Sequence, residues 1–172
     1  MQIIKTKFKD LFFYKRDTFH DNRGYFKELY IEKKIKKKFC FDYLSTSKKN
    51  VIRGLHIQTK KPQGKLITVL NGKIFDAVID CRKKSKTFGK IFTTEMSADK
   101  NISLYIPEGF AHGFCSLKDN TILHYKCTEY RDEKSETGII WNDNYLKIKW
   151  PVLKPILSKK DKKNVEFKKI NF

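Results

Sequence analysis

The sequence predicts an all-β protein, built as a sandwich or a barrel of short strands. Short apolar runs recur along the chain, and turn-forming residues separate one run from the next. Asn71-Gly72 marks a tight turn between two of these runs, and stretches with helical periodicity are scarce. The predicted strands cover residues 11–15, 24–30, 39–45, 51–58, 65–70, 73–80, 91–96, 102–106, 111–117 and 121–128.

Asn71-Gly72 is the sharpest local signal in the chain. Strand-like residues 66–70 precede it and strand-like residues 74–79 follow it. Two-residue hairpin loops favour Asn-Gly, because both of its residues accept positive φ angles. The sequence therefore predicts a hairpin in which these two strands pair.

The length of 172 residues suits one domain, which we expect to span residues 1–172. Helix is expected only within residues 32–38 and just after Ser158, where Ser158 and Asp161 have the spacing of a capping box. No stretch approaches the ~20 apolar residues of a membrane helix, and the first residues lack the apolar core of a signal peptide. We therefore expect a cytoplasmic protein without a membrane partner.

Four cysteines, Cys40, Cys81, Cys115 and Cys127, lie among strand-forming residues. None of them has the C-x-x-C spacing of a metal or redox motif. Four buried free thiols are expected, rather than disulfides or a zinc site.

The formal net charge of +19 raises nucleic-acid or anionic-membrane binding as a hypothesis. The lysines are spread along the chain, with local runs in residues 33–38 and 159–163. That distribution is more typical of a solvated surface, so no nucleic-acid partner is expected. A positive field would also attract a nucleotide diphosphate, and the charge alone does not separate these functions.

Two of the four histidines stand inside strand-like runs that contain glycine. His56 lies in VIRGLHIQ (residues 51–58) and His112 lies in PEGFAHGF (residues 107–114). Either histidine alone favours a core residue whose hydrogen bonds are satisfied. As a pair they are candidates for general acid/base or anion-binding groups.

Period-two alternation indicates which strand side chains share a face. In residues 121–128, Tyr125 shares a face with apolar residues and is expected to point inward, whereas His124 points the other way. Lys65 shares a face with Ile67 and Val69, and an inward lysine needs an anionic partner or substrate. The alternative is a lysine that snorkels from the start of its strand.

Arg53 and His56 are three residues apart, so a regular strand would send them to opposite faces. Gly54 between them favours a bulge, which would bring both side chains to one pocket. His56 is followed by Gln58, where many metal-binding β-barrels carry a second histidine. A three-histidine or facial-triad site cannot be assembled from these residues, so no metal is expected.

Ordered motifs along nearly the whole chain resemble the dTDP-4-dehydrorhamnose 3,5-epimerase family. The resemblance implies a cupin-like double-stranded β-helix, that is, a jelly-roll barrel with short peripheral helices. It also implies a homodimer that needs no cofactor. The matching segments are Asp21-x-Arg23-Gly24-Tyr25-Phe26-x-Glu28, Arg53-Gly54-Leu55-His56-x-Gln58, Gln63-Gly64-Lys65-Leu66, Pro107-x-Gly109-Phe110-Ala111-His112-Gly113-Phe114, Tyr125, Glu136, Trp141-Asn142-Asp143, Trp150-Pro151 and Leu157-Ser158-x-Lys160-Asp161.

The resemblance also assigns roles, residue by residue. It makes His56 the catalytic base, Asp161 the carboxylate that orients it, and Tyr125 the general acid. Lys65 matches the lysine that stabilises a developing enolate oxygen. From the residues alone, the capping box is an equally good explanation of Asp161. The positions that match substrate-binding residues are Phe19, Arg23, Glu28, Arg53, His112 and Lys160.

Three positions depart from the family pattern. Phe41 and Tyr43 stand where a glutamine and an asparagine are usual and help to bind the thymidine end. Arg131 stands where an aromatic residue is common. Phe41 and Tyr43 are therefore counted among the substrate-binding residues, and a GDP-linked 4-keto sugar, including a 6-deoxy-heptose, becomes a hypothesis beside the dTDP sugar.

The sequence thus predicts an epimerase that inverts C3, C5 or both centres of a nucleotide-linked 4-keto-6-deoxy sugar for surface polysaccharide synthesis. Strands within residues 1–48 are expected at the dimer interface, and residues 145–172 are expected to close the barrel. One alternative is a related isomerase that moves the keto group between C3 and C4. The other is a non-catalytic protein that binds sugar nucleotides or nucleic acid.

Overall fold

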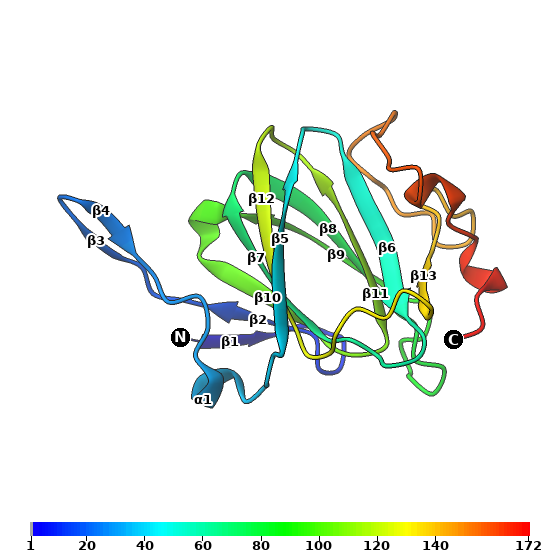
Figure 1. Ribbon diagram of the computed structural model, residues 1–172, viewed down its shortest axis with the longest axis horizontal. Helices are drawn as coiled ribbons and strands as arrows, with labels where there is room; N and C mark the ends of the chain where they lie inside the picture. The colour runs from blue at the N-terminus through cyan, green and yellow to red at the C-terminus, as the bar shows by residue number, and fades with distance from the viewer. Residues whose placement is uncertain (1) are drawn as a thin grey trace.

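The computed structural model describes residues 2–172 as two facing antiparallel sheets and one projecting hairpin (Figure 1). The all-β prediction is confirmed. The six-stranded sheet has the order β1 (Gln2–Lys5), β2 (Phe12–Lys15), β10 (Ile102–Ile106), β7 (Lys65–Asn71), β12 (Thr121–Cys127) and β5 (Phe41–Ser47). The five-stranded sheet has the order β13 (Glu136–Gly138), β6 (Ile52–Gln58), β11 (Phe110–Ser116), β8 (Lys73–Asp80) and β9 (Ile91–Ser97). The hairpin pairs β3 (Phe19–Asp21) with β4 (Gly24–Phe26).

The strands that the sequence did not predict are short. β1, β3 and β13 span three or four residues, and every residue of β1 and β3 is exposed. Exposed strands of this length carry no alternation of apolar and polar residues, so period-two patterns cannot reveal them. Helices are few, as expected: α1 (Glu32–Ile35) and the 3₁₀ helices η1 (Ala98–Lys100), η2 (Asp161–Lys163) and η3 (Phe167–Lys169).

The hairpin predicted at Asn71-Gly72 is wrong. The turn is present, but β7 pairs with β10 and β12, whereas β8 pairs with β11 and β9 in the other sheet. Gly72, at φ 81°, turns the chain from one sheet into the facing one, and a Cβ there would lie 3.0 Å from the Cα of Thr121. A turn dipeptide fixes the local direction of the chain, while burial of both strands selects their partners.

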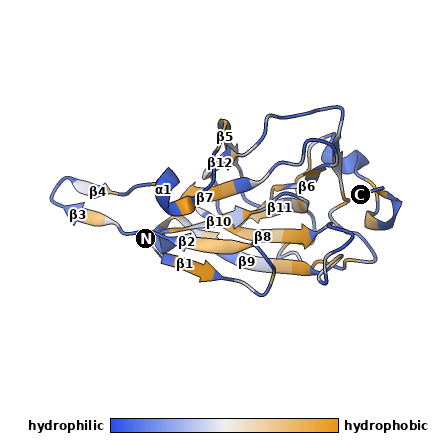
Figure 2. Cartoon of the chain, turned by 90° about the horizontal axis from the view of Figure 1, so that it is seen from below, coloured by the Kyte–Doolittle hydropathy of each residue, from blue (hydrophilic) through white to orange (hydrophobic). Residues whose placement is uncertain are grey.

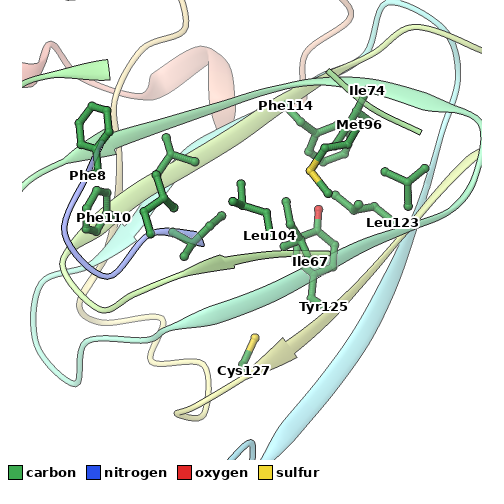
Figure 3. Packing of buried hydrophobic residues seen from close by; sticks show 14 residues of the cluster. Phe8, Ile67, Ile74, Met96, Leu104, Phe110, Phe114, Leu123, Tyr125 and Cys127 are labelled. Atoms are coloured by element: carbon green, nitrogen blue, oxygen red, sulfur yellow. The ribbon is translucent and has the colours of Figure 1, made fainter. Parts of the chain in front are cut away.

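The main hydrophobic core fills the space between the two sheets (Figure 3). Inward residues of β7, β10 and β12 meet inward residues of β8, β9 and β11. Burying an aliphatic or aromatic side chain of this kind contributes about 1.5–3 kcal/mol. Its buried members are Phe8, Leu11, Ile67, Val69, Ile74, Val78, Met96, Leu104, Ile106, Phe110, Phe114, Leu123, Tyr125 and Cys127.

The two outer faces are covered by segments from opposite ends of the chain. The C-terminal segment places Leu146 and Phe167 on the outer face of the five-stranded sheet, and it lies on the side of the molecule away from the β3–β4 hairpin (Figure 1). Helix α1 places Ile35 against Tyr14, whose hydroxyl donates to the Ile35 carbonyl at 3.1 Å. Orange strands between blue connections in Figure 2 show the same division by hydropathy.

The cysteines are free, as predicted. Cys81, Cys115 and Cys127 are buried, but Cys40 is exposed, because it lies just before the edge strand β5. The expectation that all four are buried is therefore wrong for Cys40. Within residues 2–172, no helix has the length and apolar character needed to cross a membrane.

Candidate active site

A cavity of about 390 Å³ lies between the two sheets, within the size range of small-ligand sites. β5, β7 and β12 line it from the six-stranded sheet, β6 and β11 line it from the five-stranded sheet, and the C-terminal segment closes one side. The lining residues are Phe41, Tyr43, Ser45, Arg53, His56, Ile57, Gln58, Gln63, Lys65, His112, Phe114, Tyr125, Arg131, Glu136, Ser158, Lys160 and Asp161.

His56 and Asp161 form a hydrogen-bonded pair in this cavity. His56 Nε2 lies 2.6 Å from Asp161 Oδ1, and the imidazole is partly exposed while the carboxylate is buried. Ser158 Oγ donates to the other carboxylate oxygen at 2.9 Å and accepts from the Asp161 amide at 3.0 Å. Burial alone would raise the pKa of Asp161, but the hydrogen bonds from His56 and Ser158 outweigh it and lower that pKa. Asp161 therefore bonds the imidazole and also belongs to the turn that begins at Ser158, so the two explanations of this residue are compatible.

A bulge at Gly54 brings Arg53 and His56 to the same cavity, as predicted. His112 pairs with His56, whereas Phe114 pairs with Arg53, so β6 carries one extra residue between the two pairs. Gly54 has φ 122°, and a Cβ there would lie 2.5 Å from the Cα of Gly113. Only glycine fits this close approach of two strands. Arg53 is held in place by Ser47 Oγ and the Thr46 carbonyl, to which it donates at 3.0 and 2.9 Å.

Tyr125 points inward from β12, as alternation predicts, and lines the cavity opposite β6. Burial raises the pKa of its phenol well above the usual value, so the hydroxyl keeps its proton at neutral pH. The ring of Tyr43, directly opposite on β5, stacks on the Tyr125 ring with centroids 4.5 Å apart and planes 13° apart. His124 points outward to Asp42, also as predicted.

Lys65 lies at the start of β7 and lines the cavity. Burial lowers the pKa of its amine, and the nearby carboxylates of Glu136 and Asp76 act in the opposite sense. Within the described chain, 2–172, Lys65 forms no ion pair. The amine is therefore available to a ligand anion.

His112 is buried and bound to a carboxylate that sequence reasoning missed. Its Nε2 lies 2.7 Å from Asp76 Oδ1, and Asp76 is fully buried in β8. Asp76 Oδ2 is buried too, with no hydrogen-bond partner in residues 2–172. An aspartate between Phe75 and Ala77 in an apolar strand was the available signal, because a buried charge requires a partner.

Three charged side chains that line the cavity are paired with one another. Lys160 Nζ lies 2.7 Å from Glu136 Oε1, and Arg131 Nε donates to Glu136 Oε2 at 2.8 Å. Burial alone would raise the pKa of Glu136, but these hydrogen bonds hold it at about 2. The pairing fixes Lys160 and Arg131 in the wall of the cavity, which Phe41 and Tyr43 also line.

Three predicted substrate-binding residues lie away from this cavity. Phe19 and Arg23 sit on the projecting β3–β4 hairpin, where Phe19 is 59% exposed and Arg23 pairs with Asp21 at 2.6 Å. Glu28 follows the hairpin and borders a separate small pocket beside Arg16. Within one protomer these three residues do not line the cavity, since the hairpin extends away from the barrel (Figure 1), and their role in substrate binding stays a prediction.

The predicted site residues that do line the cavity are suited to proton transfer at carbon. A histidine held by a carboxylate can accept a proton, and a protonated phenol across the cavity can return one. A cationic lysine can stabilise the oxyanion that forms in between. Among residues 2–172, no three histidine, cysteine, aspartate or glutamate side chains are grouped so as to hold a metal ion.

Comparison with known proteins agrees with this arrangement. A family model described as dTDP-4-dehydrorhamnose 3,5-epimerase matches residues 5–169. The enzyme of that name from Shigella flexneri is 42% identical over 168 residues, which cover 94% of this chain and 93% of that protein.

Solved structures give the same result. The dTDP-4-dehydrorhamnose 3,5-epimerase of Bacillus anthracis, with TDP and PPi bound, superposes with a TM-score of 0.93 at 41% identity, over 96% of this chain and 98% of that one. The Legionella pneumophila dTDP-6-deoxy-D-glucose-3,5-epimerase, in complex with dTDP-4-keto-L-rhamnose, superposes with a TM-score of 0.94 at 36% identity, over 99% and 94% of the two chains. These matches span nearly the whole fold and the cavity described above, and the chain belongs to the dTDP-4-dehydrorhamnose 3,5-epimerase family.

Proposed function

We propose that this protein epimerises a nucleotide-linked 4-keto-6-deoxy sugar, with His56 as base and Tyr125 as acid. The observation that carries the proposal is their placement on facing sheets. The Asp161-bound imidazole of His56 reaches the cavity from β6, and the buried phenol of Tyr125 reaches it from β12. Inversion at carbon needs a base on one face of the sugar and an acid on the other, and this arrangement supplies both.

The chemistry follows from the ketone at C4. A C–H bond at C3 or C5 is acidic because the electron pair left behind moves onto the C4 oxygen. His56 takes the proton, and the product is an enolate. Tyr125 then gives its phenolic proton to the opposite face of the same carbon, and the C4 ketone re-forms. Solvent then accepts the proton that His56 gained and returns one to Tyr125. The substrate already carries the ketone, so no redox step is involved.

The enolate oxygen requires stabilisation, for which Lys65 and His112 are the best-placed groups. Lys65 points into the cavity without an ion pair among the described residues, 2–172, and His112 is fixed by Asp76. Donors aimed at a developing oxyanion in a cavity with little water are worth several kcal/mol, of order 3 kcal/mol each. Arg53 and Lys160 remain for the diphosphate, which carries negative charge.

The nucleotide is proposed from the residues that depart from the family pattern. Phe41, Tyr43 and Arg131 line the cavity together, and Phe41 lies between Tyr43 and Tyr130, with ring centroids 5.4 and 6.4 Å away. A purine gives more stacking area than thymine, and a guanidinium offers donors to the guanine O6. We therefore include GDP-linked sugars, among them 6-deoxy-heptoses, as substrates. Much faster turnover of the dTDP sugar than of its GDP counterpart would refute this part.

A homodimer completes the proposal. The rings of Phe19, Tyr25 and Phe26 on the hairpin are 59%, 59% and 65% exposed, and all residues of the edge strand β1 are exposed. Such a surface is suited to a second copy of the chain, which could receive the hairpin beside its own cavity. Sedimentation equilibrium should give a dimer for the natural chain and a monomer after the double change Phe19→Ser and Phe26→Ser. A natural chain that stays monomeric at assay concentration would contradict the dimer.

The activity itself is tested by incubation with dTDP- and GDP-linked 4-keto-6-deoxy sugars in D2O. Proton NMR follows the C3 and C5 signals, and the proposal predicts that one or both are lost through exchange, with inverted product. A product with its ketone at C3 would instead identify a ketoisomerase. No exchange with any of these sugars would contradict the proposal and leave a binding protein.

A further inference from the structure

Tyr43 lies face to face with the proposed acid. It occupies the β5 position directly opposite Tyr125 on β12, and the two rings are 4.5 Å apart between centroids with planes 13° apart. This is the shortest of the centroid distances within the aromatic row that Tyr125, Tyr43 and Phe41 form along the cavity wall. The usual family residue at position 43, an asparagine, has no ring with which to make this contact.

Tyr125 makes two ring contacts of different kinds. Tyr43 covers one of its faces, and His112 meets it edge-on with centroids 6.3 Å apart and planes 66° apart. His112 is itself fixed by Asp76 at 2.7 Å. Tyr43 itself is 38% exposed and borders the open cavity. Removing the Tyr43 ring would therefore uncover one face of the Tyr125 ring toward the cavity.

We propose that Tyr43 is a positioning residue. It holds the Tyr125 phenol where it can protonate the reacting sugar carbon on the face opposite His56. The inference rests on the proposed function and adds a separate claim to it. His56 acts without Tyr43, since the His56–Asp161 pair lies on β6 and η2. Tyr43 decides whether the enolate, once formed, is protonated by Tyr125 with inversion or by His56 with return to substrate.

The two fates of the enolate, protonation by Tyr125 or by His56, differ in a measurable way. In D2O, the His56 proton exchanges with solvent, so protonation by His56 returns substrate that carries deuterium at an unchanged centre. Protonation by Tyr125 gives deuterium at an inverted centre. In both cases the electron pair returns from the C4 oxygen to carbon, and only the donor and the face differ. The ratio of inverted product to labelled substrate therefore reports the position of the phenol.

The experiment measures this ratio at early times by NMR for the natural chain, Tyr43→Leu and Tyr43→Phe. Misplacement of a catalytic group by about 1 Å can cost of order a hundredfold, so Tyr43→Leu should lower the ratio at least ~tenfold while exchange continues. Tyr43→Phe keeps the ring and should keep the ratio. Leu44→Ala is the matched control, because Leu44 is the next residue of β5, 61% exposed on the other face.

An unchanged ratio in Tyr43→Leu would overturn the inference, even if turnover fell. Loss of exchange together with inversion would also overturn it, since Tyr43 would then act on binding or on the His56 step. Tyr43→Asn, which introduces the usual family residue, provides a second variant if Tyr43→Leu fails to fold. Absence of exchange in the natural chain would instead refute the proposed function, so the two failures are distinguishable.

Discussion

His56 and Asp161 meet across 105 residues of sequence, with 2.6 Å between Nε2 and Oδ1. The carboxylate that holds the imidazole is itself held by Ser158, whose hydroxyl donates to its second oxygen and accepts from the Asp161 amide. The turn therefore fixes the carboxylate, and the carboxylate fixes the ring. A base that is oriented in this way loses little free energy to reorganisation when it accepts a proton.

Replacing Asp161 by Asn should lower kcat by about a hundredfold or more, because the amide cannot stabilise the imidazolium that forms. The measurement is kcat and KM with the preferred sugar nucleotide, beside a thermal melt. Ser158→Ala is the control, since it removes the two Ser158 bonds to Asp161 but keeps the carboxylate that bonds His56, and it should cost much less activity. An Asp161→Asn enzyme with near-natural kcat would show that His56 needs no carboxylate.

Lys65→Met should lower kcat by about 10²–10³-fold if the amine stabilises the enolate oxygen. Burial lowers the Lys65 pKa, so this lysine loses its charge at a lower pH than an exposed lysine does. Activity of the natural enzyme should therefore fall as pH rises through that lowered pKa, and this alkaline limb should be absent from the residual activity of Lys65→Met. Identical kcat–pH profiles for the two proteins would remove Lys65 from the mechanism.

Gly54→Ala should destabilise the fold by about 3 kcal/mol, through a strained φ and a collision with β11. Gly24→Ala is the matched control, because Gly24 also has a positive φ but has no atom within 4 Å of an added Cβ. It should cost only about 1 kcal/mol. Urea unfolding measures both values. Equal losses of unfolding free energy in the two variants would mean that the close approach of Gly54 to Gly113 contributes nothing to the cost of Gly54→Ala.

Asp80 makes the stability of the fold depend on pH in the acid range. Burial alone would raise its pKa, but hydrogen bonds from Arg82, Ser85 and Thr87 hold that pKa at about 2. A depressed carboxyl pKa stabilises the fold above the unfolded value near 4, and this contribution, on the order of 2 kcal/mol, is lost as pH falls from about 4 to about 2. The difference in unfolding free energy between the natural chain and Asp80→Asn should shrink over that range. A difference that does not change with pH would contradict the assignment.

Local sequence patterns predicted most strands and the directions of their side chains. Alternation placed Tyr125 inward and His124 outward, and Gly54 correctly indicated the bulge beside His56. These patterns do not predict which strands pair with each other. Asn71-Gly72 specifies a turn equally well between paired strands and between strands of two sheets, because burial of distant residues decides the outcome.

Other features of the site depend on contacts that spacing does not reveal. Asp76 meets His112 only because β8 and β11 pair, although the aspartate stands out in its apolar strand. Phe19 and Arg23 lie on a hairpin whose direction no alternation determines. The role of Asp161 came from the family resemblance, since its spacing from Ser158 is explained equally well by the capping turn.

The central claim is that His56 removes the proton, and the most direct test compares the natural chain with His56→Asn in D2O. Loss of the C3 and C5 proton signals is followed by NMR with the preferred sugar nucleotide, and thermal melting checks the fold. We predict no exchange and no inversion in His56→Asn, with an unchanged melting transition. Exchange at the natural rate in a folded His56→Asn protein would show that another group is the base.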